Sequence, residues 1–288
     1  MKKSDELFPM SLNENYYVVM ANALVKGRQL MTKQEAQLLM IVISQIAKTD
    51  IRLKSYTTTV KELAEFMNVS EYLLYRDLPD ICSDLCSRVV EIHEPGWKKW
   101  RVFNWIKCAE YCNGKLTIRI SDEIRPYLLQ LNACYSQTQL KILLNFDSYY
   151  AIRLYQYLWA EVGEHKVPKD YWEFTIEELR ELFQTKKKYK QATDLIKKTL
   201  RVALDELASS DYVEIWDYQE HKAAEKGAPI AYVSFHAKFF PKAVAKELSL
   251  PDNQLLAEHS PEITVQDMMN LLSPSFLLDC SKETGEIV

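Results

Sequence analysis

One short segment concentrates the side chains that could bind a polyanion. From Lys186 to Arg201 the chain carries seven bases and only one acid. Lysine neutralises phosphate groups, whereas arginine and glutamine can also form paired hydrogen bonds to base edges. We therefore expect DNA contact through Lys186, Lys187, Lys188, Tyr189, Lys190, Gln191, Lys197, Lys198 and Arg201. The alternative is an ordinary solvated helix face.

Side chains suited to catalysis form no recognisable pattern. The five histidines never occur as His-x-His, so the sequence lacks the metal site of a rolling-circle nickase despite its seventeen tyrosines. The six glycines form no Gly-rich phosphate loop. Acidic pairs such as Glu177 with Glu178 suit helix N-termini, where carboxylates interact favourably with the helix dipole. We expect no enzymatic activity and no cofactor.

Two C-x-x-x-C pairs, Cys82 with Cys86 and Cys108 with Cys112, could suggest zinc. Zinc sites more often use C-x-x-C, and the second pair lies in a strand-like run. The sequence therefore favours reduced, buried cysteines and no metal site.

A weak internal repeat organises the chain. Residues 58–67 and 174–183 share a threonine, an apolar residue, a charged pair and a leucine. In each copy, a threonine and a glutamate three residues later have the capping-box spacing that marks a helix start. These pairs are Thr59 with Glu62 and Thr175 with Glu178.

Similar elements surround both copies. A longer amphipathic helix is expected before each copy, over 32–47 and 148–162. A second helix is expected after each, over 70–86 and 189–208, the latter with an apolar seam of Ile196, Leu200, Ala203 and Leu207. Strands should follow at 89–92, 99–111 and 115–120 in the first half and at 212–216 and 230–235 in the second. The order is that of a helix–turn–helix followed by a hairpin wing.

The first copy is less basic than the second. Its second helix contains Pro79, which is expected to kink or break a helix interior. Candidates for DNA contact here are Ser70, Tyr72, Tyr75 and Arg76, although the tyrosines could equally be packing residues. Trp97 to Arg101 suits either a wing on DNA phosphates or the rim of a protein interface.

These patterns predict an α+β protein, mainly helical, with two tandem winged-helix domains related by a pseudo-two-fold internal repeat. We expect an N-terminal domain over 1–130, a DNA-reading domain over 131–240 and an acidic tail or linker over 241–288. The net charge of −4 is concentrated in this tail, which has three lysines against eight acids. Apolar strand edges at Val102, Phe103 and Trp105 favour a homodimer through the first domain.

Several segments resemble the initiator replication proteins of iteron-type plasmids. The resemblance rests on residues 22–26, 30–38, 148–158, 174–183 and 189–207, and it covers about 15–240. It implies two winged helices that bind direct repeats in double-stranded origin DNA and help to open the duplex. It also implies recruitment of host replication proteins, such as helicase, primase or the host initiator, and repression of the protein's own promoter by a dimer.

Three other readings remain open from the sequence. A winged-helix transcription regulator without initiator activity would bind an inverted operator as a dimer. A nickase would form a covalent tyrosine–DNA adduct, and a partitioning or scaffold protein would show little sequence preference. No apolar run is long enough for a membrane helix, and no secretory signal is evident, so we expect a cytoplasmic protein without membrane partners.

Overall fold

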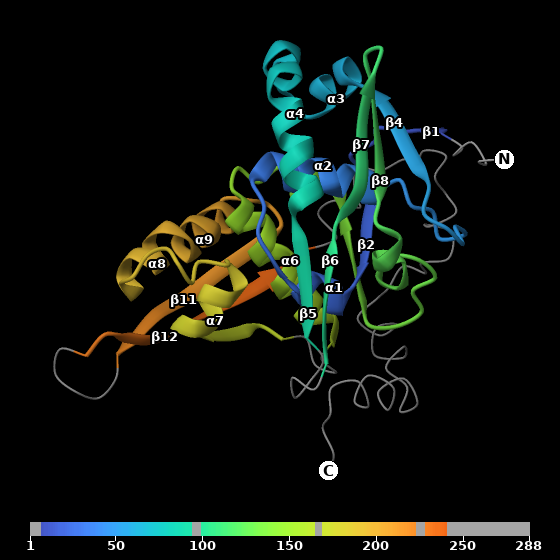
Figure 1. Cartoon of the computed structure of the whole chain (residues 1–288). Coiled ribbons are helices and arrows are strands. Elements are labelled where there is room, and N and C mark those ends of the chain that lie inside the picture. Colours follow the sequence, from blue (N-terminus) through green and yellow to red (C-terminus); the bar gives the residue numbers. More distant parts are fainter. Residues whose placement is uncertain (1–6, 94–98, 165–168, 223–227, 241–288) are drawn as a thin grey trace.

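The structure is a computed structural model, and it describes residues 7–93, 99–164, 169–222 and 228–240. Helices account for 41% and strands for 31% of the described residues, so the structure is mixed and not clearly mainly helical as expected. Two groups of elements lie on either side of the helix α6 (Tyr149–Glu164), as Figure 1 shows. No helix within the described ranges is long and apolar enough to cross a membrane.

The first group is built around a capped helix and a longer second helix. It begins with β1 (Leu7–Pro9), β2 (Tyr17–Ala21), α1 (Asn22–Lys26), β3 (Arg28–Gln29) and α2 (Lys33–Ile43). The strand β4 (Ser55–Thr59) then leads into the helix–turn–helix, which consists of α3 (Val60–Phe66) and α4 (Glu71–Ser87). The expected capping box is present at Thr59 before α3, and a second capping box, at Thr32, precedes α2. These reciprocal hydrogen bonds satisfy backbone groups at each helix start.

Pro79 lies inside α4 without ending it, which corrects the expected break. Proline removes one backbone donor, but Pro79 is exposed, so water can solvate the carbonyl that loses its partner. The other face of the helix is apolar and buries Leu74, Leu78 and Leu85. Burial of this face stabilises the helix across the proline.

The strands of the first group belong to separate sheets. They are β5 (Val89–His93), β6 (Trp100–Asn104), β7 (Ile106–Cys112), β8 (Lys115–Ile120) and β9 (Tyr135–Gln139). The orders are β1-β4-β8-β7, β3-β5-β6 and β2-β9. A 3-10 helix, η2 (Asp122–Tyr127), and α5 (Leu140–Leu144) complete the group.

Trp105 divides the strand expected over 99–111. Its side chain is completely buried, and its backbone bonds to Arg88 and Ser121 instead of continuing a ladder. The chain therefore leaves one sheet as β6 and enters another as β7. Trp105 is not an exposed strand edge, which corrects that expectation, whereas Val102 is exposed and Phe103 is half-buried.

The second group repeats the order of strand, capped helix, second helix and two strands. It comprises β10 (Tyr171–Thr175), α7 (Ile176–Leu182), α8 (Ala192–Lys198), α9 (Leu200–Ala208), β11 (Val213–Lys222) and β12 (Ile230–Phe239). The antiparallel sheet has the order β10-β12-β11. Trp172, Phe174 and Phe235 stack between this sheet and the helices, which builds the core.

The single helix expected over 189–208 is two helices. It starts only at Ala192, and it is interrupted at Thr199, whose backbone has φ −129° and ψ −75°. The Thr199 hydroxyl is buried and donates to the Leu195 carbonyl at 2.7 Å. Side-chain bonds of this kind compete with regular helical bonding and bend the helix. The apolar seam survives the break, since Ile196, Leu200 and Leu207 are buried.

Arg153 on α6 contacts both groups, since its Nε lies 3.5 Å from the Leu182 carbonyl of α7 and its other nitrogens bond to carbonyls at the end of α1. Its side chain is 1% exposed, and its guanidinium donates to the carbonyls of Val25 and Gly27, the latter at 2.7 Å. Among the described residues no carboxylate pairs with it. The carbonyls at the end of α1 carry the negative end of the helix dipole, so they replace a counter-ion.

The pairing of β2 with β9 bears on the division of the chain. β9 comes after residue 130 yet forms an antiparallel ladder with β2, from Tyr17 with Gln139 to Ala21 with Tyr135. The boundary expected at residue 130 stays a prediction, and this pairing favours a later one. The expected acidic tail, 241–288, lies outside the described residues.

Candidate nucleic-acid interface

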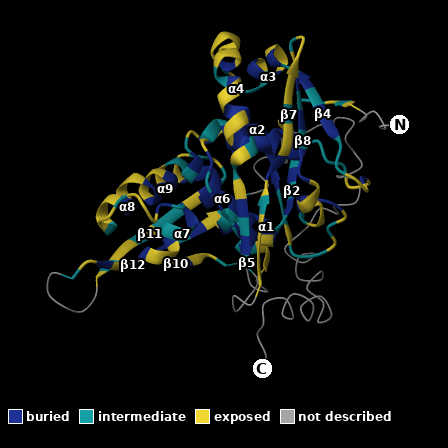
Figure 2. Ribbon diagram, in the orientation of Figure 1, coloured by how far each residue is buried: buried dark blue, intermediate teal, exposed yellow. Residues whose placement is uncertain are grey.

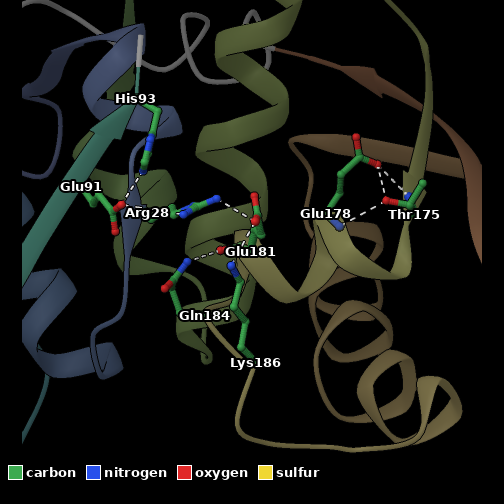
Figure 3. Close-up of polar contacts among 8 residues, drawn as sticks. All are labelled: Arg28, Glu91, His93, Thr175, Glu178, Glu181, Gln184 and Lys186. Atoms are coloured by element: carbon green, nitrogen blue, oxygen red, sulfur yellow. Dashed lines mark hydrogen bonds and ion pairs between the residues drawn. The ribbon is translucent and has the colours of Figure 1, made fainter. Parts of the chain in front are cut away.

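The basic segment forms the turn of the second helix–turn–helix and the helix after it. A capping box at Thr175 starts α7, with Glu178 accepting from the Thr175 backbone at 2.8 Å (Figure 3). The turn between α7 and α8 places Gln184 and Tyr189 in the left-handed region, with φ of 51° and 52°. It therefore reverses the chain sharply without using a glycine.

The turn presents its lysines to solvent. All but one of the expected contact residues of this domain are exposed, and Tyr189 is half-buried. The exposed members are Lys186, Lys187, Lys188, Lys190, Gln191, Lys197, Lys198 and Arg201. Figure 2 shows the same exposure along the outer side of α8. The structure thus brings most of these charges onto one continuous turn and helix.

Tyr189 links the turn to the end of α8. The Lys198 ammonium lies 5.4 Å from the centre of the Tyr189 ring, a cation–π distance. Tyr150 on α6 lies close enough to Tyr189 to bond to it, and burial together with this bond raises the pKa of Tyr150 to about 12. Tyr189 therefore packs inside the site and orients Lys198, which the sequence did not indicate.

Arg201 faces the wing strand β11. Its guanidinium carbon lies 3.6 Å from the centre of the Tyr218 ring, and its Nη2 lies 3.9 Å from Glu220 Oε1. The Tyr218 hydroxyl donates to the same Glu220 oxygen at 3.0 Å. Burial, followed by this hydrogen bond, raises the pKa of Tyr218 above its usual range. Tyr218 and Glu220 were missed from the sequence because neither follows a motif.

Glu181 ties the basic turn to the first group of elements. Its Oε1 accepts from Arg28 at 2.6 Å and from Lys186 at 3.1 Å (Figure 3). Burial alone would raise the pKa of Glu181, but the hydrogen bonds from Arg28 and Lys186 outweigh it and lower the pKa. Arg28 also lies 3.7 Å from Glu91 on β5, which in turn contacts His93. Lys186 is consequently held by an acid, unlike its exposed neighbours Lys187 and Lys188.

The first helix–turn–helix exposes its four expected contact residues without a basic surface. Ser70 precedes α4 but makes no side-chain cap. Tyr72 is 75% exposed, and Tyr75 packs edge-to-face on Tyr111 at 5.7 Å. Arg76 is paired with Asp77 at 2.6 Å. This face is aromatic and partly acidic, so the structure does not bring these residues into a cationic cluster.

The thiols agree only partly with the expected burial. Cys82 is buried and Cys86 half-buried, but Cys108 and Cys112 on β7 are exposed, which corrects the expectation for that pair. Burial raises the pKa of Cys82 to about 11, so it is a neutral thiol at ordinary pH. The described part of the chain has no cluster of three or more His, Cys, Asp or Glu residues that could hold a metal. Residues 223–227 and residues 94–98, which include Trp97, lie outside the described residues.

Comparison with known proteins gives consistent matches. Residues 17–159 match the family described as Initiator Replication protein, WH1, and residues 175–237 match Initiator Rep protein, WH2. A "Replication initiation protein" of Escherichia coli is 27% identical over 176 residues, which cover 60% of this chain and 55% of that protein. The solved structure described as "Crystal structure of Pi initiator protein in complex with iteron DNA" has a TM-score of 0.61 at 16% identity. That alignment covers 80% of this chain and 99% of the other.

Proposed function

The chain belongs to the family of initiator replication proteins, and we propose that it starts plasmid replication by binding direct repeats at the origin. The similar Pi initiator structure contains iteron DNA, which supports this class of site. The E. coli relative is matched over 55% of its length, so its name supports initiation as a proposal for the whole protein. We assign no catalytic step.

The exposed lysine turn before α8 carries this proposal. In a helix–turn–helix, the N-terminal part of the second helix approaches base edges, and flanking bases neutralise phosphates. Gln191 immediately precedes α8, and Lys187, Lys188 and Lys190 precede it on the turn. We assign base contact to Gln191, Lys197, Lys198 and, after release from Tyr218, Arg201, whereas the other lysines contact phosphate.

The first domain has a separate role in this proposal. Its helix α4 lacks a cationic surface, so Ser70, Tyr72, Tyr75 and Arg76 make at most auxiliary contacts. Exposed Val102 on the edge strand β6 supports pairing of two chains. We propose that a dimer represses the protein's own promoter and that a monomer binds the origin repeat, helps to open the duplex and recruits host replication proteins in the cytoplasm.

A binding titration across a salt series tests the proposal. The probes are duplexes with a direct repeat from DNA flanking the gene, an inverted repeat and a scrambled sequence. Each phosphate contact contributes roughly −0.9 to the slope of log affinity against log salt. Replacing Lys187 or Lys188 by alanine should therefore weaken binding to all three probes and flatten the slope by up to about one unit. Lys48, exposed in the loop after α2, is the matched control.

Each outcome has a distinct meaning. Preference for direct repeats with flattened slopes supports the initiator. Preference for the inverted repeat alone would favour a transcription regulator. If Lys187→Ala and Lys188→Ala bind like Lys48→Ala at every salt concentration, the turn is not the DNA-binding element and the assignment fails.

A further inference from the structure

Arg180, which the sequence did not single out, binds the backbone of the basic turn through its side chain. It lies on α7, and its guanidinium donates from Nη1 to the Lys188 carbonyl at 3.1 Å and from Nη2 to the Lys190 carbonyl at 3.0 Å. Its own backbone carbonyl accepts from the Thr185 amide at 2.9 Å. One residue therefore contacts both the beginning and the end of the turn.

The two carbonyls belong to the residues on either side of Tyr189, one of the two left-handed residues of the turn. Tyr189 lies between Lys188 and Lys190 and has φ 52°, a conformation that non-glycine residues seldom adopt because it brings Cβ too close to a carbonyl oxygen. Such conformations persist only where surrounding contacts enforce them. The paired hydrogen bonds from Arg180 supply that enforcement, because they fix the peptide group before Tyr189 and the peptide group after Lys190.

We propose that Arg180 is a positioning residue for DNA binding: it fixes the backbone that carries Lys187, Lys188, Lys190 and Gln191. This inference rests on the proposed function. The planar guanidinium presents two parallel donors to the two carbonyls, whereas a lysine ammonium has no such fork. Its contribution thus comes from geometry, and the same charge on a lysine does not replace it.

Arg180→Lys separates geometry from charge, and limited trypsin digestion of the free protein reports the turn directly. A loosened turn exposes cleavage sites after Lys186, Lys187, Lys188 and Lys190. We expect Arg180→Lys to be cut there several-fold faster than wild type, with a similar melting temperature. Lys187→Ala, which leaves the Arg180 contacts intact, is the control for altered cleavage sites.

The DNA titration gives the second readout. Loss of the paired bonds should lower affinity for the direct repeat about tenfold in Arg180→Lys, which corresponds to about 1.4 kcal/mol of binding free energy. Binding to the scrambled duplex and the salt slope should remain close to wild type. Arg180→Gln should behave in the same way if geometry dominates.

Two results would overturn this role. Wild-type affinity and cleavage in Arg180→Lys would show that the fork is dispensable. Wild-type affinity in Arg180→Lys, together with a flattened salt slope in Arg180→Gln, would show that Arg180 contacts phosphate. Either leaves the proposed function intact, whereas a wild-type protein without preference for the repeat would refute the function itself, even if the digestion pattern changed as expected.

Discussion

Replacing Arg153 by methionine tests how the two winged helices are joined. The buried guanidinium bonds to the carbonyls of Val25 and Gly27, and Lys26 contributes a longer contact at 3.4 Å. Methionine fills much of the same space but donates no hydrogen bond. The carbonyls of Val25 and Gly27 would then be left without partners inside the protein.

The expected loss follows from these contacts. A buried acceptor without a partner costs about 1–3 kcal/mol, and two such carbonyls give about 2–6 kcal/mol. Burial disfavours the charged form of Arg153 and lowers its pKa, so removing the charge recovers part of this cost. We therefore expect Arg153→Met to lower the free energy of unfolding by about 2–4 kcal/mol.

Urea unfolding followed by tryptophan fluorescence measures this change. Arg201→Met is the matched control, since Arg201 is exposed and should lose less than about 1 kcal/mol. The free energy of unfolding of Arg153→Lys should lie between those of wild type and Arg153→Met, because an ammonium donates to some of these carbonyls. If Arg153→Met is as stable as Arg201→Met, the carbonyls find other partners and the assigned role of Arg153 is wrong.

Three further predictions concern stability. Thr175→Ala removes the capping box of α7 and should cost about 1 kcal/mol in thermal unfolding; an unchanged melting temperature would contradict this. Leu200→Ala, at a fully buried position of the seam, should lower the free energy of unfolding by about 2–5 kcal/mol, measured by urea unfolding. A loss below about 1 kcal/mol would mean that the seam is not packed. Burial alone would raise the pKa of Glu161, but the hydrogen bond from Lys169 and neighbouring contacts lower it below the ordinary 4.5. The resulting stability is present above pH 4.5 and is lost as pH falls through the lowered pKa, so Glu161→Gln should flatten the acid limb of a stability–pH curve.

Local signals predicted the starts of helices and the hairpins. Thr59 and Thr175 cap α3 and α7 as expected, because a capping box depends only on residues three apart. Asn113 and Gly114 join β7 to β8, since both adopt positive φ. The two winged-helix domains follow from the order of these elements.

The features that the sequence did not predict depend on contacts between residues that are far apart in the chain. Trp105 suits a strand by propensity, and only its burial against other elements stops the ladder. The interruption at Thr199 arises from a side-chain bond inside a segment whose apolar spacing is still helical. Likewise, Arg180 and Tyr218 enter the candidate site through geometry, and nothing in their neighbouring sequence distinguishes them from other surface residues.

The ladder between β2 and β9 has a consequence for synthesis of the chain. Tyr17 and Gln139 are joined by a hydrogen bond across 122 residues. At about 5–20 residues per second, Tyr17 leaves the ribosome roughly 6–24 s before its partner. During that interval the apolar strand of Tyr17–Ala21 has an unpaired edge, the kind of surface that invites wrong pairing. A nascent chain shorter than about 140 residues therefore lacks the strand that completes this ladder, however well its helix–turn–helix has already formed.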